Sequence, residues 1–167
     1  MVGRNKLSSL RSDGVITISG IGDHDPGSAD HDHRNTQLLT VPGIAYIVAT
    51  ALVAFVGDIQ RFPSARHFAS YLGLTPKEFS SGSKRRLGRI SKKGDVYLRM
   101  LLIHGARSIL AHAHKAKQPD RLQSWALQLE RKVGSNKAAV ALANKIARIA
   151  WAVWKHDCDF ESRPVAA

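Results

Sequence analysis

The chain has 167 residues, which is enough for one ordinary domain with a hydrophobic core. Its composition, 44% apolar and 23% charged, excludes a wholly disordered chain, and no apolar run reaches the roughly 18 residues of a membrane-spanning helix. A net charge of +12 favours a polyanionic partner, nucleic acid before membrane.

The single cysteine, Cys158, excludes an internal disulfide framework. The amino terminus has too short an apolar stretch for a signal peptide, so we expect a cytoplasmic protein. Residues 1–35 hold five acidic against four basic side chains and show no sustained apolar period, which predicts a mostly disordered tail that could end in a short helix. The surplus of positive charge lies in residues 36–157, the predicted folded domain, and residues 158–167 are expected to fray.

The first motif of this domain is a possible helix-hairpin-helix. A helix entering at Leu38, a tight turn at Pro42-Gly43 and a second helix opening at Ile44 and running to Val56 match that pattern. Free N–H groups in the first turn of the second helix could hold a DNA phosphate without any base preference. An ordinary loop and helix start is the simpler alternative. Pro42, Gly43 and Ile44 are accordingly candidate DNA-binding residues.

The sequence predicts a further helix over residues 63–72, which ends before Gly73. Residues 74–90 contain two glycines and a proline, which forbid a long helix and predict an exposed, extended loop or a loose hairpin. Basic side chains are concentrated in this loop and just after it. The candidate DNA contacts here are Lys84, Arg85, Arg86, Arg89, Lys92, Lys93 and Arg99.

The remaining sequence predicts three more helices. Asp95 suits the N-cap of a long apolar helix, Pro119-Asp120 opens a helix to about Val133, and the last helix covers residues 137–155. On the last helix a stripe of Lys145, Arg148 and Lys155 lies opposite a wide apolar arc, and this stripe either faces solvent or faces phosphate. Five or so helices and one basic Ser/Gly loop predict an all-α helical bundle.

The chemistry open to this domain is narrow. Acidic residues are few and form no cluster of the kind that holds two divalent metals, and no glycine-rich nucleotide loop ends in Lys-Ser or Lys-Thr. Hydroxyl chemistry remains, because Ser80 and Ser81 stand in the loop that carries the cations. A serine oxygen can attack a phosphodiester where cations stabilise the developing charge. A loop that only binds backbone phosphates is the alternative.

Nine segments, in order, resemble the C-terminal domain of insertion-sequence transposases of the 110/116/902 group. They include Leu39-Thr40-Val41-Pro42-Gly43-Ile44, Phe79-Ser80-Ser81-Gly82 and Ser91-Lys92-Lys93-Gly94-Asp95. The full set covers residues 39–44, 57–59, 61–66, 71–76, 79–82, 87–95, 97–99, 101–107 and 139–145. Each segment is weak alone, and their order makes the resemblance specific.

The resemblance implies a two-part recombinase. In that family an N-terminal RuvC-like domain binds divalent metal through acidic residues, the C-terminal domain supplies a serine nucleophile, and an element-encoded RNA guides recognition of DNA. Carried onto this chain, the nucleophile falls on Ser80 or Ser81, with a slight preference for Ser80, and the Pro42-Gly43 turn corresponds to the family's helix-hairpin-helix. Expected partners are DNA, guide RNA, and a second copy or an intact transposase, but no membrane.

The RuvC-like half has no counterpart in this sequence. We therefore expect a C-terminal domain or truncated transposase that binds nucleic acid but does not complete recombination alone, with no metal site of its own and Mg²⁺ acting only with the RuvC-like domain. The alternatives are a stand-alone helix-hairpin-helix protein that binds nucleic acid without catalysis, and a repressor of intact transposase.

Overall fold

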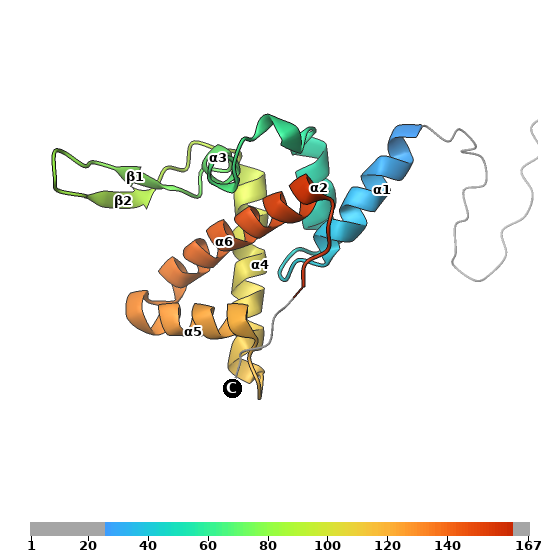
Figure 1. The fold of residues 1–167 in the computed structure, drawn as a ribbon. Helices are drawn as coiled ribbons and strands as arrows, with labels where there is room; N and C mark the ends of the chain where they lie inside the picture. The colour runs from blue at the N-terminus through green and yellow to red at the C-terminus, as the bar shows by residue number, and fades with distance from the viewer. Residues whose placement is uncertain (1–25, 162–167) are drawn as a thin grey trace, which may run out of the picture.

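A computed structural model describes residues 26–161, which fold into six α-helices, one short 3-10 helix and a two-stranded sheet (Figure 1). In chain order these are α1 (Pro26–Leu39), α2 (Tyr46–Val56), η1 (Ile59–Arg61), α3 (Ala65–Tyr71), β1 (Pro76–Glu78), β2 (Leu87–Ile90), α4 (Val96–Lys115), α5 (Arg121–Val133) and α6 (Ser135–His156). The predicted all-α class is confirmed, and the basic loop forms the two strands. No helix in the described range combines the length and hydropathy needed to cross a membrane.

Local sequence signals set the ends of the later helices. Asp95 accepts a hydrogen bond from the Leu98 N–H at 2.7 Å and so caps α4, as predicted. Asp120 and Gln123 form a reciprocal capping box at the start of α5. Gly134, with φ 84°, separates α5 from α6 by a single residue, so α6 begins two residues earlier than expected.

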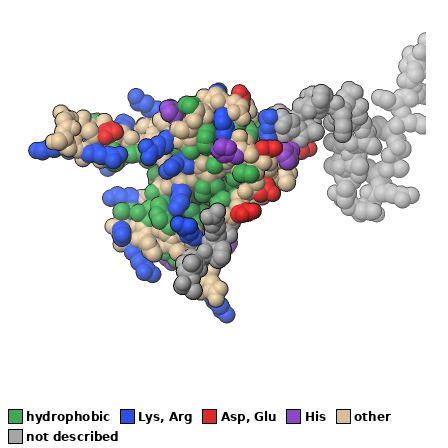
Figure 2. Space-filling view, viewed as in Figure 1, with side chains coloured by type: hydrophobic (Ala, Val, Ile, Leu, Met, Phe, Trp, Pro, Cys, Tyr) green, Lys and Arg blue, Asp and Glu red, His purple; other side chains and the backbone are tan. Residues whose placement is uncertain are grey.

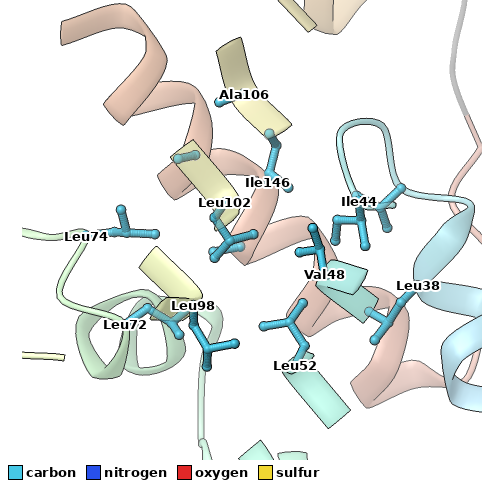
Figure 3. Close-up of a cluster of buried hydrophobic side chains, with 14 of the residues drawn as sticks. Leu38, Ile44, Val48, Leu52, Leu72, Leu74, Leu98, Leu102, Ala106 and Ile146 are labelled. Carbon is cyan, nitrogen blue, oxygen red and sulfur yellow. The ribbon is translucent and has the colours of Figure 1, made fainter. Parts of the chain in front are cut away.

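Helix α6 is central to the packing, because it contacts α1, α3, α4 and α5. Figure 3 shows Ile146 of α6 in one cluster with Leu98 and Leu102 of α4 and with Val48 and Leu52 of α2. Small side chains predominate on the buried face of α6, which allows the neighbouring helices to approach its axis closely. The buried residues are Ala138, Ala139, Leu142, Ala143, Ile146, Ala147, Ala150, Val153 and Trp154.

The turn between α1 and α2 packs against α4. Gly43 adopts φ 80°, and a Cβ added to Gly105 of α4 would overlap the Gly43 carbonyl oxygen. The Ile44 side chain is buried, and its N–H donates to the Val41 carbonyl at 3.1 Å. This turn therefore anchors two helices to the core, while a phosphate-binding role for Pro42, Gly43 and Ile44 stays a prediction.

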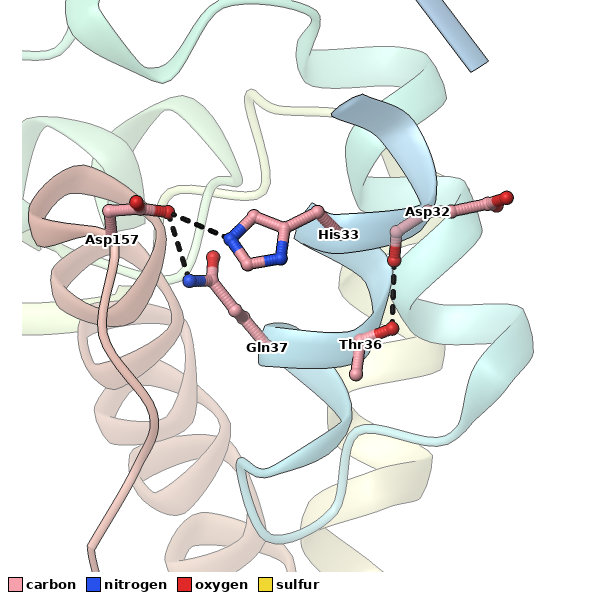
Figure 4. A network of polar contacts seen from close by, with 5 residues as sticks. All are labelled: Asp32, His33, Thr36, Gln37 and Asp157. Atoms are coloured by element: carbon pink, nitrogen blue, oxygen red, sulfur yellow. Dashed lines mark hydrogen bonds and ion pairs between the residues drawn. The ribbon is translucent and has the colours of Figure 1, made fainter. Parts of the chain in front are cut away.

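Polar contacts tie α1 to the end of α6 (Figure 4). Asp157 follows α6 in the left-handed conformation, and its Oδ1 accepts a hydrogen bond from Gln37 Nε2 at 2.9 Å. His33 Nε2 lies 3.4 Å from the same oxygen. Because Gln37 is buried and α1 begins at Pro26, the expected boundary of the tail at residue 35 falls inside a packed helix. The rest of the predicted tail, residues 1–25, lies outside the described residues.

The close approach of Gly43 and Gly105 predicts a specific sensitivity. Gly105→Ala should lower the free energy of unfolding by about 2 kcal/mol or more, although alanine favours helix, because the new methyl group must displace the α1–α2 turn. His104→Ala, at the neighbouring exposed position of α4, should change stability by less than about 0.5 kcal/mol. Urea denaturation measures both, and equal stabilities for the two variants would contradict the close approach.

Candidate nucleic-acid interface

The predicted basic loop is an antiparallel hairpin that projects from the helical body (Figure 1). Pro76 pairs with Ile90, Glu78 pairs with Leu87, and an isolated bridge joins Ser81 to Lys84 near the tip. Gly82, the first of the two turn residues, has φ 57°, a conformation that suits glycine in such a turn. The strand sequences do not alternate apolar and polar residues. They can nevertheless form this hairpin, because both of its faces are solvated.

Positive charge follows the whole hairpin and the segment after it. Figure 2 shows basic side chains along this arm and a single acidic side chain among them. Glu78 is the only acidic residue between positions 76 and 94, against seven basic ones. All seven are exposed, namely Lys77, Lys84, Arg85, Arg86, Arg89, Lys92 and Lys93. Six of them are candidates predicted from the sequence; the structure places Lys84, Arg85, Arg86 and Arg89 on the projecting hairpin and Lys92 and Lys93 at its base.

Ser80 occupies a polar cluster on this arm. Its Oγ donates to Glu78 Oε1 at 2.6 Å and accepts a hydrogen bond from the Arg86 N–H at 3.1 Å. Arg85 Nε lies 3.7 Å from the same Glu78 oxygen. A carboxylate placed in this way can accept the serine proton when the hydroxyl attacks. The cluster is exposed, so a substrate as large as a nucleic acid can reach it.

Ser81 is placed differently. Its main-chain N–H and carbonyl both pair with Lys84, each at 3.2 Å, close to the turn. Within residues 26–161 its hydroxyl has no hydrogen-bond partner. Of the two candidate serines, only Ser80 has a neighbouring proton acceptor.

Arg99 does not share the exposed surface. It is 8% exposed, and its Nη1 donates to the carbonyl oxygens of Leu72, Gly94 and Asp95 at 3.3, 3.0 and 3.3 Å. The guanidinium thereby joins the end of α3 to the start of α4, at the base of the hairpin. The predicted DNA contact at Arg99 needs correction, because a buried guanidinium that is bonded to three carbonyls cannot reach phosphate.

A groove of about 1730 Å³ lies between the base of the hairpin and helices α5 and α6. Lys137, Lys145 and Arg148 of α6 line it together with Arg89 and Lys92 of the hairpin segment. The sequence indicated part of this surface through the stripe on the last helix, but it could not show which elements face that stripe. The third member of the stripe, Lys155, binds Gln60 instead and does not line the groove.

Lys145 has an unusual environment in this groove. Its Nζ lies 4.0 Å from the centroid of the Trp125 ring. Burial lowers the pKa of the Lys145 ammonium, and the charges of Arg121 and Arg148 lower it further. The group is thus held among like charges at a partly desolvated position, where an anion would be stabilising.

No group of three or more His, Cys, Asp or Glu side chains in the described part of the chain could hold a metal ion. The carboxylate nearest to Ser80, Glu78, is already engaged by Ser80 and Arg85. Magnesium prefers several oxygen ligands in octahedral geometry, so the residues around Ser80 do not fit a magnesium site.

Residues 35–124 match the protein family described as "Transposase IS116/IS110/IS902 family". A probable family 20 transposase from Pseudomonas aeruginosa is 48% identical over 122 residues, and the transposase for insertion sequence element IS1111A from Coxiella burnetii is 41% identical over 152 residues. A pilin gene-inverting protein from Moraxella bovis is 31% identical over 134 residues. These matches cover 73%, 88% and 79% of this chain but only 36%, 41% and 40% of the three relatives.

The placement of Arg99 predicts that its removal affects folding rather than binding. Arg99→Met should lower the free energy of unfolding by about 1–3 kcal/mol, because it removes the side-chain donor of the Leu72, Gly94 and Asp95 carbonyls, although the Asp95 carbonyl keeps the Arg99 N–H as a donor. The salt dependence of DNA binding should stay as in the unchanged chain. Arg107→Met removes the same charge from an exposed position of α4 and controls for net charge. If Arg99→Met instead made DNA binding less dependent on salt and left stability unchanged, Arg99 would be a phosphate contact after all.

Proposed function

The chain belongs to the IS116/IS110/IS902 transposase family, and from this premise we propose that it is the part of a DNA recombinase that grips DNA with the β1–β2 hairpin and attacks it with Ser80. One observation carries the proposal. Ser80 is exposed, its hydroxyl lies 2.6 Å from the Glu78 carboxylate that Arg85 also approaches, and the hairpin that carries it is rich in basic residues. The chain spans about two fifths of the length of the relatives it matches, so the activity of the whole protein is part of this proposal.

The attack requires a proton acceptor and a stabilised phosphate. Ser80 Oγ forms a bond to phosphorus, its proton passes to Glu78, and one sugar oxygen leaves and takes a proton from solvent. The Arg86 N–H that now points at Ser80 Oγ keeps that oxygen oriented. Arg85 and Arg86 supply positive charge for the phosphoryl oxygens as negative charge develops there. The product is a serine–DNA phosphodiester and a free sugar hydroxyl, which is the kind of intermediate that strand exchange needs.

The other partners belong to the same proposal. The family resemblance assigns any metal-dependent step to a RuvC-like domain, and Mg²⁺ bound by that domain stays a prediction. Guide RNA, a second copy of the chain and an intact transposase stay predictions that rest on the family. The cytoplasmic location also stays a prediction from the sequence. It would give such a protein access to cellular DNA.

The hairpin cations predict a measurable change in salt dependence. Arg85→Ala with Arg86→Ala should weaken binding to unrelated DNA duplexes alike and reduce the log–log salt slope by about 0.9 for each phosphate that the variant no longer neutralises. Fluorescence anisotropy at several salt concentrations measures this slope. Lys115→Ala with Lys117→Ala, at the exposed end of α4, removes the same charge away from the hairpin and should leave the slope unchanged. A slope that is identical in the two double variants would show that Arg85 and Arg86 do not meet phosphate.

The nucleophile is tested by a pair of single substitutions. Ser80→Ala should leave DNA affinity within about twofold, yet the same change at the matching serine of a full-length relative should abolish formation of a covalent protein–DNA adduct. Ser81→Ala should retain the adduct, because its hydroxyl has no proton acceptor. Denaturing gels with a nicked DNA substrate separate adduct from free protein. An adduct that survives the Ser80 change, or disappears with the Ser81 change, would assign the chemistry to another residue.

A further inference from the structure

The groove between the hairpin and α6 has a one-sided charge. Five basic side chains line it, from two distant stretches of the sequence, and no Asp or Glu does. None of the five forms an ion pair within residues 26–161. The five are Arg89, Lys92, Lys137, Lys145 and Arg148. A surface of this kind is complementary to a polyanion.

Lys145 lies among like charges in this groove. Its ammonium is partly desolvated and faces Arg121 and Arg148, a combination that lowers its pKa. Its neighbours from α5 and from β2 include no carboxylate in the groove lining. Bound phosphate would relieve the repulsion among these side chains.

The floor of the groove is apolar and in part aromatic. Trp125 of α5 and Trp151 of α6 line it, and the Trp125 ring already stacks against the Lys145 ammonium. The other apolar lining residues are Ala65, Leu74, Pro76, Leu87, Ile90, Val140, Ala141, Ile149 and Ala152. A DNA duplex presents phosphates outside and hides the faces of its bases, whereas an unpaired strand presents both phosphates and base faces. Proteins bind unpaired strands by combining cations with aromatic side chains in this way.

The groove is continuous with the hairpin, because Arg89 belongs to both and Lys92 lines the groove just after β2 ends. We propose that the groove binds an unpaired DNA strand, the strand that leads to or from the phosphodiester at Ser80. This inference rests on the proposed function for the location of the cleaved bond. It adds a second contact surface, formed by Lys137, Lys145, Arg148 and Trp125, and the form of DNA that this surface accepts.

The experiment uses the whole chain and three labelled oligonucleotides of one sequence: a 20-nucleotide DNA strand, its duplex and the RNA strand. Lys145→Ala with Arg148→Ala should weaken binding of the DNA strand at least tenfold and reduce its log–log salt slope by about 1.4, since each phosphate neutralised on a single strand contributes roughly 0.7 to the slope. Affinity for the duplex should fall less than threefold. Lys115→Ala with Lys117→Ala, which removes the same charge outside the groove, should change affinity for the strand less than twofold.

A second readout tests the aromatic floor. The DNA strand should quench tryptophan fluorescence in the unchanged chain, and Trp125→Phe should remove part of that quenching. Thermal denaturation checks that each variant is folded, and Lys145→Gln with Arg148→Gln replaces the alanine pair if that pair unfolds.

Two results would overturn the proposal. One is an equal reduction of strand affinity in the groove pair and the control pair, which would make the effect one of net charge. The other is a preference of the groove for duplex DNA or RNA, seen as a larger reduction in affinity for either of them than for the DNA strand. An adduct formed by a Ser80 variant would contradict the proposal that Ser80 is the nucleophile, but it would not affect the measurements of strand binding in the groove. Failure of the proposed nucleophile and failure of the proposed groove are therefore distinguishable.

Discussion

The small side chains on the buried face of α6 are the constraint on which the other elements depend. Five of its nine buried residues are alanines (Ala138, Ala139, Ala143, Ala147 and Ala150), so α3, α4 and α5 can all approach this helix closely. A larger side chain at these positions would push at least one neighbour outward. Because one side of α6 is used in this way, its other side, with Lys145 and Arg148, is left facing the hairpin across the groove.

The hairpin itself has no core of its own, and its position is set at its base. Arg99 holds the end of α3 and the start of α4 together through three carbonyl oxygens. The Ser91 N–H donates to the Thr75 carbonyl at 2.8 Å, and the Lys92 N–H donates to the Gly73 carbonyl at 3.1 Å. These bonds fix where the arm leaves the helical body, while the arm beyond them stays exposed. A clamped base and a solvated, cationic arm suit an element that must meet a large polyanion.

Much of the fold could be predicted because its signals are local. Asp95 and Asp120 cap helices where a side-chain oxygen precedes an apolar period, and Gly134 ends a helix because it tolerates a positive φ. The candidate site was predicted in part. The charge density around Ser80 is visible in the chain, but Arg99 looks the same as its basic neighbours until the packing of α3 against the start of α4 buries it.

By itself the sequence determined the helical class, the position of the basic serine loop and membership of a transposase family. It did so because helix periods, caps, turns and local charge depend on residues close together in the chain. The tertiary structure alone decided three further matters: that Ser80 and not Ser81 lies beside a carboxylate, that the Gly43 turn meets Gly105, and that α5, α6 and the hairpin enclose one basic groove. Each of these depends on a side chain's orientation or on contacts between distant segments, and neither leaves a periodic trace in the sequence.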